Sequence, residues 1–134
     1  VIADREKEEE SKRLTVLRDY AIARILKEIP GAQLNGDPLL RLPNNINVSF
    51  RDVDGEMLML ALDQKGIQIS TGSACTVSSL EASHIIEALG LSESLAKGNV
   101  RITLGRENTK KQIDRALKIL HSEITRLRKL KKSK

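Results

Sequence analysis

Two short segments that alternate strictly between apolar and polar residues lie between two long segments of helical periodicity, and this order constrains the fold most. Residues 46–50 read INVSF and residues 100–104 read VRITL. Alternation with a period of two is typical of a strand that has one face on a core and the other toward solvent. The sequence therefore predicts a sheet with one apolar face and one polar face.

The long segments near both ends of the chain carry apolar residues every three or four positions, which predicts amphipathic helices. Pro30 and Gly31 end the first helix. The last helix begins at Thr109, which forms the T-x-x-Q pattern of a capping box with Gln112. The apolar stripe of the first helix is Leu14, Leu17, Ala21, Ile22, Ile25, Leu26 and Ile29, and that of the last helix is Ile113, Ala116, Leu117, Leu120, Ile124, Leu127 and Leu130.

Shorter elements fill the space between these helices. Residues 32–35 and 67–70 are predicted strands, and residues 55–65 and 80–90 are predicted helices, each ended by a glycine. Short strands and helices in this order predict an α+β fold, a two-layer sandwich of a small, largely antiparallel sheet with helices on one face.

The length suits a single domain over residues 1–134. We expect a charged helix start at residues 1–13, a mobile cysteine-bearing loop at 71–80 and a basic tail at 129–134. The surplus positive charge concentrates in RLRKLKKSK, residues 126–134, which is more typical of a solvated helix end than of a nucleic-acid site. We therefore expect no nucleic-acid partner.

The composition narrows the class of protein further. Tyr20 and Phe50 are the only aromatic residues, so the core must be aliphatic. The single cysteine cannot form an internal disulfide, and no apolar run is long enough for a signal region or a membrane span. We expect a cytoplasmic protein without a membrane partner.

Cys75 lies in TGSACTVSS, a run of small residues at 71–79 with neither helical nor strand periodicity. A lone cysteine is often a small buried apolar residue. Its neighbours, however, are poor core formers, which favours an exposed thiol on a mobile segment that could carry a transferable group. The residues alone leave both interpretations open.

Arg101 lies in the middle of a predicted strand, on its polar side. It is either a solvated arginine on an open sheet face or a bidentate clamp for a carboxylate, which a guanidinium serves better than an ammonium group. His84 and His121 lie on predicted helices and are expected at the surface. No spacing of metal-ligating residues predicts a metal site.

Four strings carry a resemblance to a known family: LPNNINVSF, GEMLMLALDQKGIQISTGSAC, GSACTVSSLEASHIIEALGL and VRITLGRENTKKQID. They resemble the C-terminal small domain of cysteine desulfurases, pyridoxal-phosphate enzymes of fold type I that mobilise sulfur for iron–sulfur clusters. The resemblance covers nearly the whole chain, from about residue 14 to residue 130. The GSACT string is similar to that of the long-loop class of these enzymes.

The resemblance implies a role for two residues. Cys75 matches the nucleophile that takes sulfur from L-cysteine as a persulfide and leaves alanine, and Arg101 matches the arginine that binds the substrate carboxylate. Arg106 also matches, without a role that we can assign. The lysine that binds pyridoxal phosphate belongs to a preceding large domain, and Lys65 and Lys97 lack its context. By itself the chain is therefore expected to bind no cofactor and to be inactive.

For the complete enzyme the resemblance implies a homodimer that passes sulfur to an iron–sulfur scaffold or another acceptor protein. One departure is Ala82, where the family usually has proline, so the helix that follows the cysteine segment could start more loosely. Two alternatives stay open at this point. One is a non-catalytic interaction domain that retains the fold, and the other is a related lyase that acts on selenocysteine.

Overall fold

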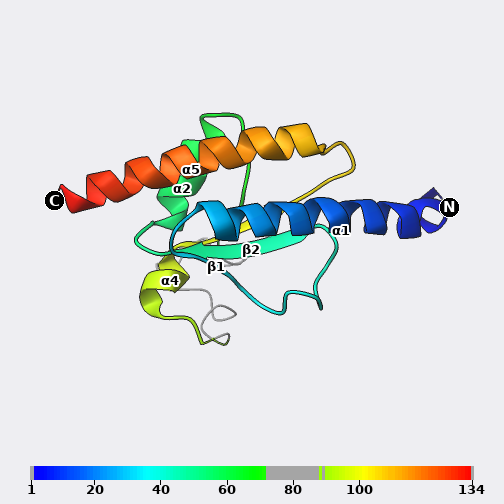
Figure 1. Ribbon diagram of the computed structural model, residues 1–134, viewed down its shortest axis with the longest axis horizontal. Helices are drawn as coiled ribbons and strands as arrows, with labels where there is room; N and C mark the ends of the chain where they lie inside the picture. The colour runs from blue at the N-terminus through cyan, green and yellow to red at the C-terminus, as the bar shows by residue number, and fades with distance from the viewer. Residues whose placement is uncertain (1, 72–87, 89, 134) are drawn as a thin grey trace.

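The computed structural model describes residues 2–71, 88 and 90–133, and in this part of the chain a three-stranded antiparallel sheet is combined with helices. Figure 1 shows α1 and α5 on the upper side of the sheet, and α4 below one end of it. The predicted α+β two-layer architecture is confirmed. In chain order the elements are α1 (Ile2–Glu28), β1 (Ala32–Leu34), β2 (Asn45–Phe50), α2 (Gly55–Asp63), α4 (Glu93–Lys97), β3 (Asn99–Thr103) and α5 (Lys110–Lys132).

The sheet has the order β1-β2-β3, with β2 in the centre. Ile46 of β2 pairs with Ile102 of β3, and Val48 pairs with Val100 on one side and Leu34 on the other. Paired residues of antiparallel strands share a face, so these apolar side chains form one surface beneath the helices. The predicted division into an apolar and a polar face is confirmed.

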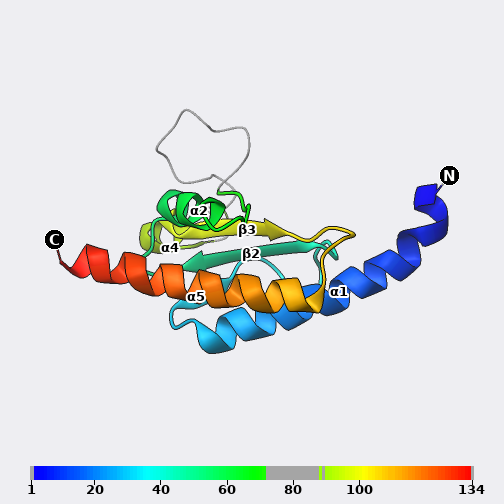
Figure 2. The same ribbon diagram turned by 90° about the horizontal axis from the view of Figure 1, so that it is seen from above.

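The core between the sheet and the helices is aliphatic except for one ring. Phe50 is fully buried, and its largest fully buried neighbours are isoleucines, leucines and valines. Seen from above, α5 runs along the sheet and α2 lies beside β3 (Figure 2). The buried members of the cluster include Ile25, Ile46, Val48, Leu58, Leu62, Val100 and Ile124.

The helix ends follow the predicted caps. The Thr109 hydroxyl accepts a hydrogen bond from the Gln112 amide, and the Gln112 side chain accepts one from the Thr109 amide at 2.9 Å, which completes the capping box. Asp54 accepts from two amides at the start of α2. Gly66 follows that helix with a φ of +75°, a conformation that glycine adopts without steric penalty.

Several features of the structure differ from the sequence-based expectations, and one expectation falls mostly on residues that the structure does not describe. The segment 67–70 is not a regular strand, because only Ser70 forms a bridge to β3. The helix α4 was not predicted. Leu26 and Leu130, expected on the apolar stripes of α1 and α5, are 43% and 54% exposed. The C-terminal end of α5 extends past the sheet (Figure 2), so the last turns of this helix have no sheet to pack against. Of the predicted helix at 80–90, most lies outside the described residues.

The connection from α4 to β3 depends on a close approach between two backbones. The carbonyl oxygen of Gly98 accepts a hydrogen bond from the amide of Phe50 at 3.0 Å, and a Cβ atom at Gly98 would collide with the backbone of Phe50. This contact fixes the point at which β3 begins. Among the described helices, none has the length and apolar character needed to cross a membrane.

Candidate functional site

The polar face of the sheet carries Arg101, the residue that the sequence singles out in β3. Arg101 is half-buried, and its Cα partner in the central strand is Asn47. On its other side Arg101 pairs with Ser70, whose amide donates to the Arg101 carbonyl at 3.0 Å and whose carbonyl accepts from the Arg101 amide at 2.7 Å. A row of polar residues therefore crosses the sheet through Arg101.

The backbone bonds also determine which side chains in this row are closest. Arg101 directs its amide and carbonyl to Ser70, and the Asn47 carbonyl accepts from the amide of Asn35 at 3.0 Å. Asn47 and Arg101 are thus a non-hydrogen-bonded pair of the antiparallel ladder. In such pairs the Cα atoms are about 4.5 Å apart and the side chains are closest. The side chains of Asn47 and Arg101 therefore leave the backbone at adjacent positions on the polar face of the sheet.

Asn47 is the centre of a network of side-chain amides. Its Oδ1 atom accepts from Asn35 Nδ2 at 2.8 Å and from Asn99 Nδ2 at 2.6 Å. Asn35 Nδ2 also donates to the hydroxyl of Ser49 at 2.9 Å. Asn35, Asn99 and Ser49 are all at least nine-tenths buried, so the carboxamide of Asn47 rests on a fixed polar layer.

Arg101 has no carboxylate partner among the residues that the structure describes. None of the ion pairs formed within the described residues involves Arg101. A guanidinium held on a strand and free of a carboxylate partner can form two parallel hydrogen bonds to a carboxylate from outside. The arrangement on this face is therefore suited to an anion with two oxygen atoms.

The loop 36–44 between β1 and β2 is held by two arginines. Arg18, only 4% exposed, donates to the carbonyl of Leu42 at 3.1 Å, and Arg41 donates to the carbonyl of Asn35 at 2.6 Å. Burial and the neighbouring Arg18 guanidinium lower the pKa of Arg41. These contacts attach the loop at the Asn35 end of the polar row.

Cys75 lies outside the described residues, and so does His84. The described chain reaches Thr71, and Ser70 precedes Cys75 by five residues. Five residues span at most about 18 Å when fully extended. The covalent chain alone therefore limits how far the thiol can lie from the Ser70–Arg101 bridge.

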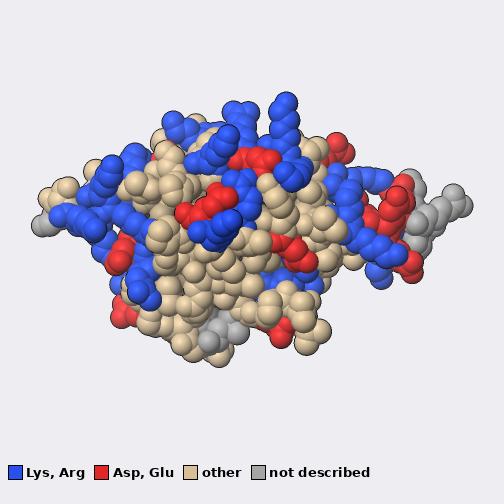
Figure 3. Space-filling model, in the orientation of Figure 1, with Lys and Arg blue, Asp and Glu red and all other residues tan. Residues whose placement is uncertain are grey.

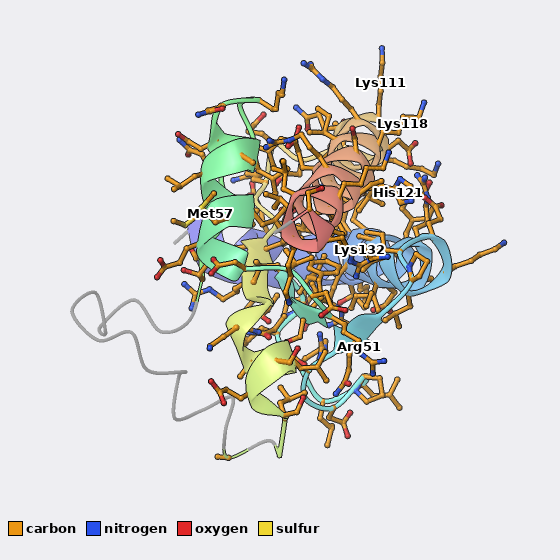
Figure 4. All side chains as sticks on the ribbon, turned by 90° about the vertical axis from the view of Figure 1, so that its left-hand side faces the viewer. Arg51, Met57, Lys111, Lys118, His121 and Lys132 are labelled. Atoms are coloured by element: carbon orange, nitrogen blue, oxygen red, sulfur yellow. The ribbon has the colours of Figure 1, made fainter. Side chains whose placement is uncertain are left out.

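The other singled-out side chains lie away from this row. Arg106 is exposed and forms an ion pair with Glu6 of α1. Lys97 pairs with Glu93 on α4 at 2.9 Å. His121 is an exposed residue of α5 (Figure 4). Within the described ranges no group of His, Asp or Glu side chains could hold a metal ion.

A cavity of about 430 Å³ lies between α5 and the segment 65–69. Its walls are mainly apolar, with Ile67, Ile102 and Leu117 among them, and they do not include Arg101 or Asn47. We take the polar face of the sheet, and not this cavity, as the candidate site, because Arg101 and the side-chain amide network lie on that face.

Positive charge is also prominent on the helix side of the molecule. Figure 3 shows Lys and Arg side chains over α5 and near the C-terminal end, and in Figure 4 Lys111 and Lys118 project from α5 away from the sheet. Lys129, Lys131 and Lys132 occupy the last turn of α5, where cations interact favourably with the helix dipole.

The amide network is the part of the site that sequence reasoning missed. Strand alternation already placed Asn47 and Ser49 on a polar face, but it did not reveal that they share this face with Arg101. The missing information was the register of β2 against β1 and β3. Three asparagines at 35, 47 and 99, each within or beside a predicted strand, were the available signal.

Comparison with known proteins defines the class. The family model of class-V aminotransferases matches residues 2–116, and the chain belongs to this family. A cysteine desulfurase IscS of Dictyoglomus turgidum is 47% identical over 123 residues, which are 92% of this chain and 31% of that protein. A cysteine desulfurase IscS of Methanosarcina thermophila is 45% identical over 129 residues, covering 96% of this chain and 32% of that protein.

Solved structures agree with this assignment. A NifS-like protein superposes with a TM-score of 0.78 at 28% identity, over 92% of this chain and 30% of that one. A NifS-like protein from Rickettsia africae, at 24% identity and a TM-score of 0.69, supports the fold alone. The chain thus spans about one third of the length of the curated relatives it matches.

Proposed function

We propose that this chain is the sulfur-accepting part of a cysteine desulfurase, in which Cys75 takes sulfur from L-cysteine and Arg101 binds the substrate carboxylate. One observation carries the proposal. The two backbone hydrogen bonds between Ser70 and Arg101 hold the start of the cysteine-bearing segment directly beside the arginine. The identity to proteins named cysteine desulfurase supports it.

The chemistry balances without an external oxidant. The Cys75 sulfur forms an S–S bond with the sulfur of L-cysteine while the substrate Cβ–S bond breaks. The Cβ atom keeps the bonding electron pair and gains a proton, so that the products are L-alanine and a persulfide on Cys75. Arg101 holds the substrate carboxylate, which fixes the orientation of the substrate sulfur toward the incoming thiolate.

Pyridoxal phosphate, which the family resemblance implies, would supply the electron sink for this bond cleavage. The polar face described here does not fit the cofactor by itself, because its residues include Arg101 as the cation but no lysine. The relatives are about three times longer than this chain. We therefore assign the cofactor to the remainder of the complete enzyme.

The product of the reaction defines the class of partner. A persulfide sulfur can be transferred to another thiolate by attack on its terminal sulfur atom, so the partner is a thiol-bearing acceptor such as an iron–sulfur scaffold protein. We place the enzyme in the cytoplasm, where free thiols remain reduced, and the family resemblance implies a homodimer for the complete protein.

The test uses the complete enzyme with Cys75→Ser. We expect the variant to bind L-alanine as the unaltered enzyme does, and to release no alanine from L-cysteine. The unaltered enzyme, mixed with one equivalent of L-cysteine, should gain one sulfur atom on the peptide that contains Cys75, as measured by mass spectrometry after alkylation. Alanine release at the unaltered rate from Cys75→Ser would refute the role of Cys75.

A further inference from the structure

We infer that Asn47 is a second carboxylate-binding residue, which donates a hydrogen bond from Nδ2 to the substrate carboxylate held by Arg101. The inference deepens the proposed function and rests on it. Asn47 lies on the central strand, opposite Arg101 in the closest type of cross-strand pair. Both side chains are partly accessible on the same face.

The orientation of the Asn47 carboxamide is determined by its neighbours. Two N–H donors, from Asn35 and Asn99, converge on its Oδ1 atom at 2.8 and 2.6 Å. A carboxamide carries its two polar atoms on one carbon, so an oxygen held by two donors turns the Nδ2 group away from them. Within the described residues Nδ2 of Asn47 donates no hydrogen bond, and Asn47 is only half-buried.

Stability alone does not account for this arrangement. Asn35 and Asn99 are 4% and 3% exposed, and the Oδ1 atom of each has no hydrogen-bond partner in the described part of the chain. Buried acceptors without partners are rare in folded proteins and need an explanation. Here both amides direct their N–H groups to Asn47 and leave their own carbonyl groups unpaired, which keeps one orientation of Asn47.

The available donors fit an α-amino acid carboxylate. Arg101 supplies a positive charge and a fork of N–H groups, and Asn47 supplies a neutral N–H from the adjacent strand. A carboxylate between them would accept from both residues, and its own charge would be balanced by Arg101 alone. The site would thereby distinguish an amino acid from an amine that lacks the carboxylate.

Two variants of the complete enzyme test the role of Asn47. Asn47→Ala removes the donor together with the acceptor of the network. Asn47→Asp keeps oxygen atoms that accept from Asn35 and Asn99, but it replaces Nδ2 with another acceptor. Gln33→Ala is the matched control, because Gln33 is an exposed amide on the same face in β1, opposite Ser49.

The probes are L-alanine and ethylamine, which differ only in the carboxylate. Binding is measured by calorimetry and by the absorbance of the bound cofactor. We expect both Asn47 variants to bind L-alanine about tenfold more weakly or worse, the usual effect of losing a hydrogen bond to a charged group. Ethylamine binding should stay within about twofold, and Gln33→Ala should leave both affinities unchanged.

Two results would overturn the inference. If the Asn47→Asp variant binds L-alanine as tightly as the unaltered enzyme, Nδ2 makes no contact with the carboxylate. Equal weakening of L-alanine and ethylamine would assign Asn47 a structural role. Measuring L-alanine binding by Arg101→Ala distinguishes a failure of the inference about Asn47 from a failure of the proposed function. If Arg101→Ala also leaves L-alanine binding unchanged, both the carboxylate site and the contribution of Asn47 are refuted.

Discussion

Ser70 and Arg101 exchange two backbone hydrogen bonds, of 3.0 and 2.7 Å, at the edge of the sheet. They are separated by 31 positions in the sequence, and the segment between them contains the single cysteine. The pairing gives the cysteine-bearing segment a fixed starting point next to the guanidinium that we assign to substrate binding. The length of the covalent chain limits how far the thiol can lie from this point.

Ser70→Pro should slow persulfide formation on Cys75, because proline removes the N–H group that donates to the Arg101 carbonyl. The loss of one backbone hydrogen bond corresponds to about a two- to tenfold effect. Ser70→Ala is the control, since it keeps the amide and removes only the hydroxyl. A single-turnover assay with L-cysteine, quenched by alkylation, measures the rate. Equal rates for the proline and alanine variants would contradict the role of the bridge.

Arg101→Ala should raise KM for L-cysteine by about tenfold to a hundredfold, with a smaller effect on kcat, because it removes a charge-assisted interaction with the carboxylate. Arg101→Lys should recover only part of the loss, since an ammonium group does not form the bidentate pair. Arg115→Ala, an exposed arginine of α5, serves as the control. Steady-state kinetics that give an unchanged KM for Arg101→Ala would exclude the clamp.

The local patterns predicted most of the fold because they depend on neighbours in the sequence. The helical stripes, the capping box of Thr109 and Gln112, and the alternating strands are all properties of short windows. The short helix α4 was missed because five residues carry too little periodicity to reveal it. Leu130 was wrongly placed in the core because a periodic pattern does not show where the sheet beneath the helix ends.

The candidate site was predictable only in part. Arg101 could be identified from its polar position in a strand, but its partners come from strands that lie far apart in the sequence. Asn47 meets Arg101 through the register of β2 and β3, and Ser70 meets it through an edge bridge. Register depends on the packing of whole strands, and a single sequence does not contain it in any one window.

Gly98→Ala should destabilise the protein by more than about 2 kcal/mol, because the new methyl group would overlap the backbone of Phe50, whose amide donates a hydrogen bond to the Gly98 carbonyl. Gly90→Ala offers a comparison at a site where a Cβ atom meets nothing within 4 Å but where φ is +73°. Its cost should be smaller, about 1 kcal/mol. Denaturant unfolding of both variants gives the two values, and equal losses would argue against the close approach at Gly98.

Tyr20→Phe should destabilise the protein at neutral pH, with an effect that shrinks in acid. The Tyr20 hydroxyl donates to Asp114 Oδ1 at 2.5 Å and joins α1 to α5. This bond, followed by the contact with Lys110, lowers the pKa of Asp114 below its ordinary value. A lowered folded-state pKa contributes stability that is present above the unfolded-state pKa of about 4 and is lost as the pH falls through the folded-state value.

The difference in unfolding free energy between the unaltered protein and Tyr20→Phe should therefore be constant from pH 7 to about pH 5 and should decline below about pH 4. Denaturant unfolding at a series of pH values measures it. In an Asp114→Asn background the same substitution should show a difference that does not change with pH, because the titrating carboxyl is gone. A difference that stays constant down to pH 2 in the protein with Asp114 would mean that the Tyr20 hydroxyl stabilises the helix pair without acting through the charge of Asp114.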